Sequence, residues 1–334
     1  MNTYPVSVNE SEIFIKLNQS ELLVGIEEFI RDVMYGTRMN DQKFSHQLIE
    51  LIPLFELIED PNLKYCCSIE IFRFIADELR ELHNGQSPDA LEPYEPYDNE
   101  IISSSHISSY QDYILGRKFE VEEELRTFKF QEQRNRTSLF QYLTQLTRHY
   151  AKLLFVRVDL GIKYDYQLDV GIEEFNAYLR KILKRVHNQD TCFKDLQGYA
   201  WAIEQGEKKG YHCHLLLIYD GHKHQNDFGL ASMVGECWNE ITEDQGYFFT
   251  SNTPEYKNRL EQKGVLGIGM IHRDNYHQVQ NAVNAGMYLV NPEKDGQYLR
   301  TWIKSMRTFG RGQYELSWRR DCTIIPEMGS EMFL

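Results

Sequence analysis

The C-terminal half of the chain alternates between apolar runs and stretches with apolar positions every three or four residues. The runs are rich in β-branched and aromatic residues and predict strands at 153–160, 199–204, 211–219 and 265–271. The stretches with helical spacing predict amphipathic helices at 172–186, 230–241 and 279–290. The order β-α-β-β-α-β-α begins like a ferredoxin-like arrangement, an antiparallel sheet with helices on one face and its first and third strands as central neighbours.

The N-terminal half shows helical spacing without strand signals. Ser20 precedes an apolar stripe as a capping residue, and Pro53 interrupts a second stripe. Further helices are expected at 62–83, in part of 101–136, and from a cap at Thr137 to about 149, with a proline- and glycine-containing connection at 84–98. We therefore expect an α+β protein: a mostly helical region, residues 1–136, followed by a ferredoxin-like domain, residues 137–334.

The charge is distributed unevenly between these two regions. The 334-residue chain has a net charge of −14, but residues 1–145 hold 13 basic and 26 acidic side chains, whereas residues 146–334 hold 23 and 24. The C-terminal half is nearly neutral, with basic clusters at 180–185 and 304–320. Charge alone does not predict DNA binding. We hypothesise that the acidic region 1–136 binds a partner, such as host replication proteins, or competes with DNA for basic surface.

Composition places the chain among globular proteins, with 42% hydrophobic and 13% aromatic residues. No apolar run is long enough for a transmembrane helix, so no membrane partner is expected. Residues 1–10 have neither a basic region nor an apolar core, which predicts no secretory signal. The six cysteines form no Cys-x-x-Cys pair, and we expect a cytoplasmic protein with reduced thiols.

The candidate chemistry centres on His212-Cys213-His214 in the strand at 211–219. Side chains alternate along a strand, so both imidazoles point to one face and form a pair of potential metal ligands. A hairpin across 206–210 brings Glu204 to the same place, which gives three ligands with open positions for substrate oxygens. Alternatively, the histidines belong to the solvated face of a half-buried sheet. The apolar run 215–218 favours a site at the mouth of a core.

The predicted helix 279–290 carries Tyr288 on its polar stripe, and Pro292 should end the helix. Tyr288 is either a surface tyrosine or a nucleophile, and an unactivated phenol is a weak nucleophile. Asn281 and Asn284 share the stripe and are candidates for DNA contacts. Farther on, Arg307 and Arg311 flank a glycine-containing turn, which either contacts phosphates or is an ordinary turn.

A His-x-His strand, an upstream glutamate and a later helix with a tyrosine together resemble the HUH endonuclease superfamily of rolling-circle replication initiators and relaxases. The more specific resemblance is to inovirus gene-II-type replication proteins and the YagK/YfjJ C-terminal domain. It covers about residues 146–315 and rests on four segments: 198–204, 210–221, the helix reaching Tyr288, and 307–312.

This resemblance implies site-specific nicking and rejoining of single-stranded DNA at a replication origin. His212, His214 and Glu204 would hold Mg²⁺ or Mn²⁺, and Tyr288 would attack the phosphate to give a 5′-phosphotyrosyl intermediate. Two positions depart from the family pattern. Cys213 stands where a bulkier apolar residue is usual, and Asn291 stands where single-tyrosine members have lysine. Lys294 is then the expected substitute for that lysine, and Tyr298 is an alternative nucleophile.

Two other functions fit the same residues. The domain could bind DNA as a regulator without cutting it, in which case the missing lysine marks lost catalysis. It could also be an unrelated metal-dependent phosphoesterase that uses only Glu204, His212 and His214.

Overall fold

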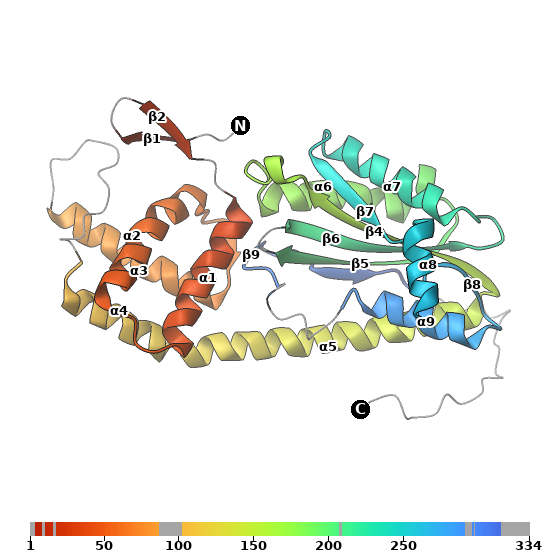
Figure 1. The fold of residues 1–334 in the computed structure, drawn as a ribbon, viewed down its shortest axis with the longest axis horizontal. Coiled ribbons are helices and arrows are strands. Elements are labelled where there is room, and N and C mark those ends of the chain that lie inside the picture. Colours follow the sequence, from red (N-terminus) through yellow and green to blue (C-terminus); the bar gives the residue numbers. More distant parts are fainter. Residues whose placement is uncertain are drawn as a thin grey trace.

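The fold joins a helical N-terminal region to an antiparallel sheet through one long helix, α5 (Figure 1). The computed structural model describes residues 4–8, 11–15, 18–86, 102–206, 209–290, 296 and 298–314. Most of the connection predicted at 84–98 lies outside the described residues. The mixed α+β class and the helical character of the N-terminal region are confirmed.

The N-terminal region consists of the paired strands β1 and β2 and of helices, and the helices pack around a common apolar core. Its elements are β1 (Tyr4–Val8), β2 (Ser11–Ile15), α1 (Gln19–Tyr35), α2 (Asp41–Ile58), β3 (Leu63–Tyr65), α3 (Cys67–Gln86), α4 (Ser104–Gly116) and α5 (Lys118–His149).

Three sequence predictions in this region were wrong at the local level. Asn18, not Ser20, caps α1, because its side chain accepts hydrogen bonds from two backbone N–H groups of the first turn. Helix α2 continues through Pro53. Burial of its apolar face stabilises the helix by more than the loss of one backbone hydrogen bond destabilises it. Thr137 lies inside α5 and donates its hydroxyl proton to the carbonyl of Gln133. The boundary predicted at 136/137 therefore falls within a continuous helix.

The rest of the chain forms the central sheet, the helices around it and a short strand that pairs with β3. The elements are β4 (Lys152–Ile162), η1 (Tyr164–Tyr166), α6 (Ile172–Asn188), η2 (Thr191–Phe193), β5 (Leu196–Gly206), β6 (Gly210–Asp220), α7 (Asp227–Ile241), β7 (Gly246–Thr250), α8 (Pro254–Gln262), β8 (Gly269–His272), α9 (Tyr276–Met287), β9 (Thr301–Ile303) and β10 (Phe309–Arg311).

The sheet is antiparallel, with the strand order β10-β5-β6-β4-β7, and β8 pairs with the start of β4. The predicted first and third strands, β4 and β6, are central neighbours as expected. The strand predicted at 265–271 begins only at Gly269. Sequence patterns missed β7 and α8, which lie between α7 and β8.

Helices cover both faces of the sheet, not one face as predicted. Helices α6 and α7 pack on the face that includes Leu215 and Leu217, whereas α9 and the second half of α5 pack on the face of Leu216 and Ile218 (Figure 1). Every β6 residue from Tyr211 to Tyr219 is buried, because both faces are covered. We call the α5/α9 side the α9 face.

The N-terminal region is attached to the sheet by β-pairing and by a buried ion pair. Strand β3 pairs antiparallel with β9. Next to this ladder, the Arg300 guanidinium donates to the Glu27 carboxylate at 2.8 Å, and both side chains are buried. The backbone N–H of Arg300 donates to the side-chain oxygen of Gln205, which directly follows Glu204 in β5. The N-terminal helices are thus bonded to the strand that carries a candidate metal ligand.

Candidate metal centre and its surroundings

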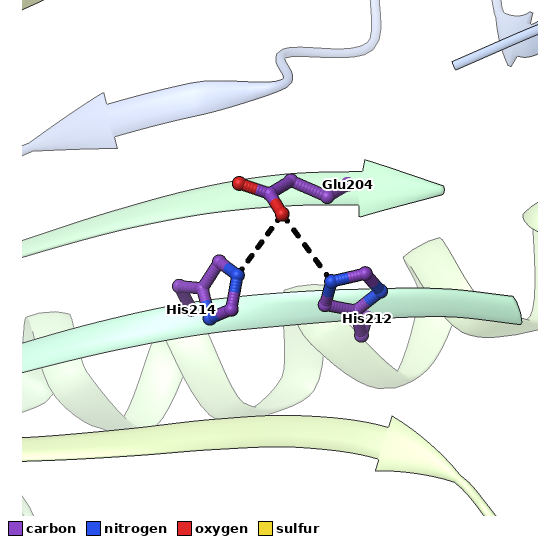
Figure 2. Close-up of side chains that lie close together, drawn as sticks. All are labelled: Glu204, His212 and His214. Atoms are coloured by element: carbon purple, nitrogen blue, oxygen red, sulfur yellow. Dashed lines mark hydrogen bonds and ion pairs between the residues drawn. The ribbon is translucent and has the colours of Figure 1, made fainter. Parts of the chain in front are cut away.

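The β5–β6 hairpin brings the three predicted ligands together on the α9 face. In the register, Glu204 lies opposite His212, and Ala202 lies opposite His214. Because strand side chains alternate, Glu204 and both imidazoles project from the same side of the sheet (Figure 2). All three side chains are buried. The predicted hairpin and the proximity of Glu204 to both histidines are confirmed.

A single carboxylate oxygen of Glu204 faces both imidazoles. Its Oε2 lies 3.1 Å from Nε2 of His214 and 3.4 Å from Nε2 of His212 (Figure 2). One potential ligand atom from each residue lies within 4.8 Å of the other two, and this group could hold a metal ion. Two imidazole nitrogens and one carboxylate oxygen suit first-row divalent metals, and three protein ligands leave coordination positions open.

The nitrogens of the two imidazoles that face away from Glu204 have their own hydrogen-bond partners. Nδ1 of His212 donates to the backbone carbonyl of Gly210 at 3.3 Å, and Nδ1 of His214 donates to Asp159 at 2.7 Å. Such contacts leave Nε2 as the ligand atom and fix the orientation of each ring. The imidazoles are therefore held in a geometry suited to binding one ion.

Asp159 and Arg157 form a second layer that sequence analysis missed. Both lie on β4 and project to the α9 face, where Nε of Arg157 donates to Oδ1 of Asp159 at 3.2 Å. The Asp159 carboxylate therefore contacts a guanidinium and the His214 imidazole. A signal for this layer exists in the sequence: two charged residues stand two positions apart in an otherwise apolar strand.

These contacts shift the protonation of His214 and Asp159 in opposite directions. Burial by itself lowers the pKa of His214, but hydrogen bonds to Asp159 and Glu204 outweigh it and raise that pKa above its ordinary value. Burial by itself raises the pKa of Asp159, but its bonds to His214 and Arg157 lower it. In the absence of metal, His214 therefore holds its proton more tightly than a free histidine.

Tyr288 lies immediately after α9 and on the same face as the candidate metal-ligating group, which consists of Glu204, His212 and His214. The helix ends at Met287, before the predicted end near 290, so Tyr288 occupies the C-cap position. Its side chain is 51% exposed, and its ring centre lies 4.8 Å from the guanidinium carbon of Arg157. Contacts thus run from Tyr288 through Arg157 and Asp159 to His214.

The approach of α9 to the sheet depends on a glycine at its penultimate position. A Cβ atom at Gly286 would lie 2.4 Å from a methyl carbon of Leu143 in α5 and 3.2 Å from one of Leu216 in β6. Only glycine fits this contact without displacement of neighbours. Gly286 therefore sets the distance between the Tyr288 end of α9 and the sheet.

The residues predicted to contact DNA occupy different environments. Arg311 is engaged within the protein, since it donates to the Ser138 hydroxyl and packs over the Tyr142 ring. Asn281 donates to the Gly264 carbonyl, whereas Asn284 and Arg307 are exposed. The structure therefore leaves Asn284 and Arg307 accessible to a ligand and gives Arg311 and Asn281 internal partners.

The alternative nucleophile Tyr298 is held by aromatic and cationic neighbours. Tyr298 packs against Phe128 of α5 and under the Arg300 guanidinium. It also lines a small cleft of about 40 Å³ that reaches Glu204, together with Leu289. Lys294, like Asn291, lies outside the described residues.

Comparison with known proteins gives one family relationship. The model of the YagK/YfjJ C-terminal domain matches residues 120–259, which span nearly all of α5 and continue from β4 into α8. The match includes the candidate metal-ligating group, Arg157 and Asp159, and it ends before Tyr288. No curated protein and no solved structure matches the chain. Among the described helices, none has the length and apolar character needed to cross a membrane.

Proposed function

We propose that this protein nicks and rejoins single-stranded DNA as a rolling-circle replication initiator of the HUH superfamily. The observation that carries the proposal is the continuous series of side-chain contacts from Tyr288 through Arg157 and Asp159 to His214. It joins a tyrosine to a two-histidine, one-glutamate group on one face of an antiparallel sheet. The strand order β5-β6-β4-β7 supports the ferredoxin-like arrangement expected for this superfamily.

The metal proposed for this group is Mg²⁺ or Mn²⁺. Glu204, His212 and His214 would hold it, and a bound ion would stabilise negative charge on the phosphate oxygens. The histidine nitrogens favour Mn²⁺ over Mg²⁺, whereas the carboxylate suits either ion. Asp159 keeps the His214 ring in place through its hydrogen bond.

The proposed reaction is a transesterification at phosphorus. The Tyr288 phenol oxygen forms a bond to the phosphorus, and the bond from that phosphorus to the 3′ oxygen breaks. The phenol gives up its proton, and the departing 3′ oxygen receives one, so the products are a 5′-phosphotyrosyl linkage and a free 3′-OH. A later attack by a 3′-OH on this linkage reverses the step and rejoins DNA without another energy source.

Arg157 provides the positive charge that this chemistry requires near Tyr288. A guanidinium this close to the ring can pair with the scissile phosphate and stabilise the negative charge that develops on it. Related single-tyrosine enzymes have a lysine at the position of Asn291, so we assign the role of that lysine to Arg157 from β4.

The decisive test is an adduct assay on denaturing gels with labelled single-stranded origin DNA and Mn²⁺. Wild-type protein should form a covalent adduct that EDTA prevents, and Tyr288→Phe should form none while keeping its thermal stability. An undiminished adduct with Tyr288→Phe would contradict the assignment of the nucleophile. Specific DNA binding without an adduct under any divalent metal would instead favour a non-catalytic regulator.

A further inference from the structure

The α9 face continues past the metal-ligating group onto the edge strand β7. In the register of β4 and β7, Phe249 lies opposite Asp159, the residue that bonds to His214. The Phe249 side chain therefore projects from the same face as the imidazoles. It is 47% exposed, although it lies in a strand of the sheet. A large exposed aromatic ring beside a polar site indicates a binding surface.

Helix α8 extends this surface with a second ring and a positive charge. The Tyr256 ring lies 5.9 Å from the Phe249 ring, and the Arg259 guanidinium carbon lies 4.8 Å from the centre of the Tyr256 ring. Both Phe249 and Arg259 are exposed. The three side chains form a row that begins next to Asp159 and leads away from the metal-ligating group.

The turn between β7 and α8 holds this row in place. The Asn252 side chain is fully buried, accepts from the backbone N–H of Arg157 and donates to the Phe155 carbonyl. The Thr253 hydroxyl then caps α8 by accepting from the backbone N–H of Tyr256. The rings are thus anchored to β4 near Arg157, and a ligand would not have to order a loose loop in order to bind.

We infer that Phe249, Tyr256 and Arg259 form a binding track for single-stranded DNA that leads to the metal-ligating group. Unpaired bases offer flat faces that stack on aromatic rings, and the guanidinium pairs with the phosphate between them. Duplex DNA keeps its bases stacked inside the helix and cannot use the rings. The inference rests on the proposed function and adds to it the path of the bound DNA strand, which runs from α8 across β7 to Asp159.

The test measures binding without chemistry. Fluorescence anisotropy in EDTA, with a labelled thymidine oligonucleotide of about 12 nucleotides, reports Kd independently of nicking. Phe249→Ala and Tyr256→Ala should each weaken binding by about 5- to 100-fold. The matched control is Phe119→Ala, which removes a ring that is 68% exposed near the start of α5, and its Kd should equal that of wild type.

Additional probes separate stacking from charge. Phe249→Leu keeps an apolar side chain but removes the ring, so it should weaken binding nearly as much as Phe249→Ala, with thermal melts verifying the fold of each variant. An abasic oligonucleotide of the same length should bind wild type and Phe249→Ala alike. Arg259→Ala should lower the slope of log Kd against log salt by about 1.

The two proposals fail in different ways. Unchanged Kd for both ring variants, or equal binding of duplex and single strand, would overturn the track. If wild type also forms the Tyr288 adduct, the proposed nicking activity stands without the track. Ring-dependent binding without any adduct would support the track and overturn the proposed nicking.

Discussion

The guanidinium carbon of Arg157 lies 4.8 Å from the centre of the Tyr288 ring, and the same guanidinium donates to Asp159. The Arg157 side chain thus contacts both the candidate nucleophile Tyr288 and Asp159, which orients the candidate metal ligand His214. Arg157 comes from β4, whereas Tyr288 follows α9, so only the folded sheet brings them together. The proposed chemistry therefore depends on how closely α9 packs against the sheet.

Removal of the Arg157 guanidinium should slow adduct formation. We expect Arg157→Ala to reduce the single-turnover rate by about 100-fold, because charge developing near Tyr288 loses its stabilisation. Arg157→Lys should restore part of the rate, since it keeps the charge without the planar fork. Arg180→Ala, at an exposed position on α6, should leave the rate unchanged. Equal rates for Arg157→Ala and wild type would exclude the proposed role.

Loss of the Asp159 carboxylate should weaken metal binding without removing a ligand. Asp159→Asn should reduce Mn²⁺ affinity by about 10- to 100-fold in titration calorimetry, as expected for a residue that orients a ligating histidine. Asp195→Asn is a suitable control, because Asp195 pairs with Lys223 at the far end of β5. If Asp159→Asn binds Mn²⁺ as tightly as wild type, His214 does not depend on this contact for ligation.

Metal affinity should increase with pH through and above the ordinary histidine range. His214 has a raised pKa when metal-free and must lose its proton to bind metal. In metal-free protein, the stability from protonated His214 is fully present below the unfolded-state pKa of about 6.5. It is lost as the pH rises through the higher folded-state pKa. The difference in Tm between protein with Mn²⁺ and protein without it should therefore increase as the pH rises across this range. A difference in Tm that stays constant with pH would contradict the prediction.

A methyl group at Gly286 should destabilise the protein. Gly286→Ala should lower the free energy of unfolding by about 1–3 kcal/mol, because its Cβ would overlap the buried Leu143 side chain. Gly25→Ala in α1 is the matched control, since a Cβ there meets no atom within 4 Å. That control should be neutral or stabilising by about 0.5–1 kcal/mol. Urea titration measures both changes, and equal effects would show that α9 can move to accept the methyl group.

Removal of one member of the buried Glu27–Arg300 ion pair should lower the free energy of unfolding substantially. Arg300→Ala should destabilise the protein by about 3–5 kcal/mol, because Glu27 would keep a buried charge without its main partner. The double variant Glu27→Leu with Arg300→Met should recover much of this loss, because it removes both charges. Chemical denaturation of wild type and both variants tests this, and a double variant no more stable than Arg300→Ala would contradict it.

The hairpin with its ligands was predictable from sequence because it depends on local rules. Alternation along a strand fixed the common face of His212 and His214, and the short connection to Glu204 fixed the pairing. The first and third strands were also placed correctly as neighbours. Each of these features depends on residues close together in the chain or on a topology with few alternatives.

The second layer and the packing of α9 were not predictable in the same way. Arg157 and Asp159 gain their roles only when β4 pairs with β6, and a charged pair in a strand does not specify its partner. The second face of the sheet is covered by α9 and by the stripe of Tyr142, Leu143 and Leu146 in α5, and the helical spacing at 137–149 does not specify which face a helix covers. The β3–β9 pairing joins short segments far apart in the chain, for which local propensity carries little information.

The Glu27–Arg300 pair has a consequence for synthesis, because its members are 273 residues apart in the chain. At about 5–20 residues per second, the ribosome needs roughly 15 to 55 seconds to supply Arg300 after Glu27. During this interval the edge of β3 has no β9 to pair with. The hydrogen bond from the Arg300 backbone N–H to Gln205, next to Glu204, is also missing until then. A nascent chain thus carries Glu204, His212 and His214 before the segment that bonds the N-terminal helices to β5 has been made.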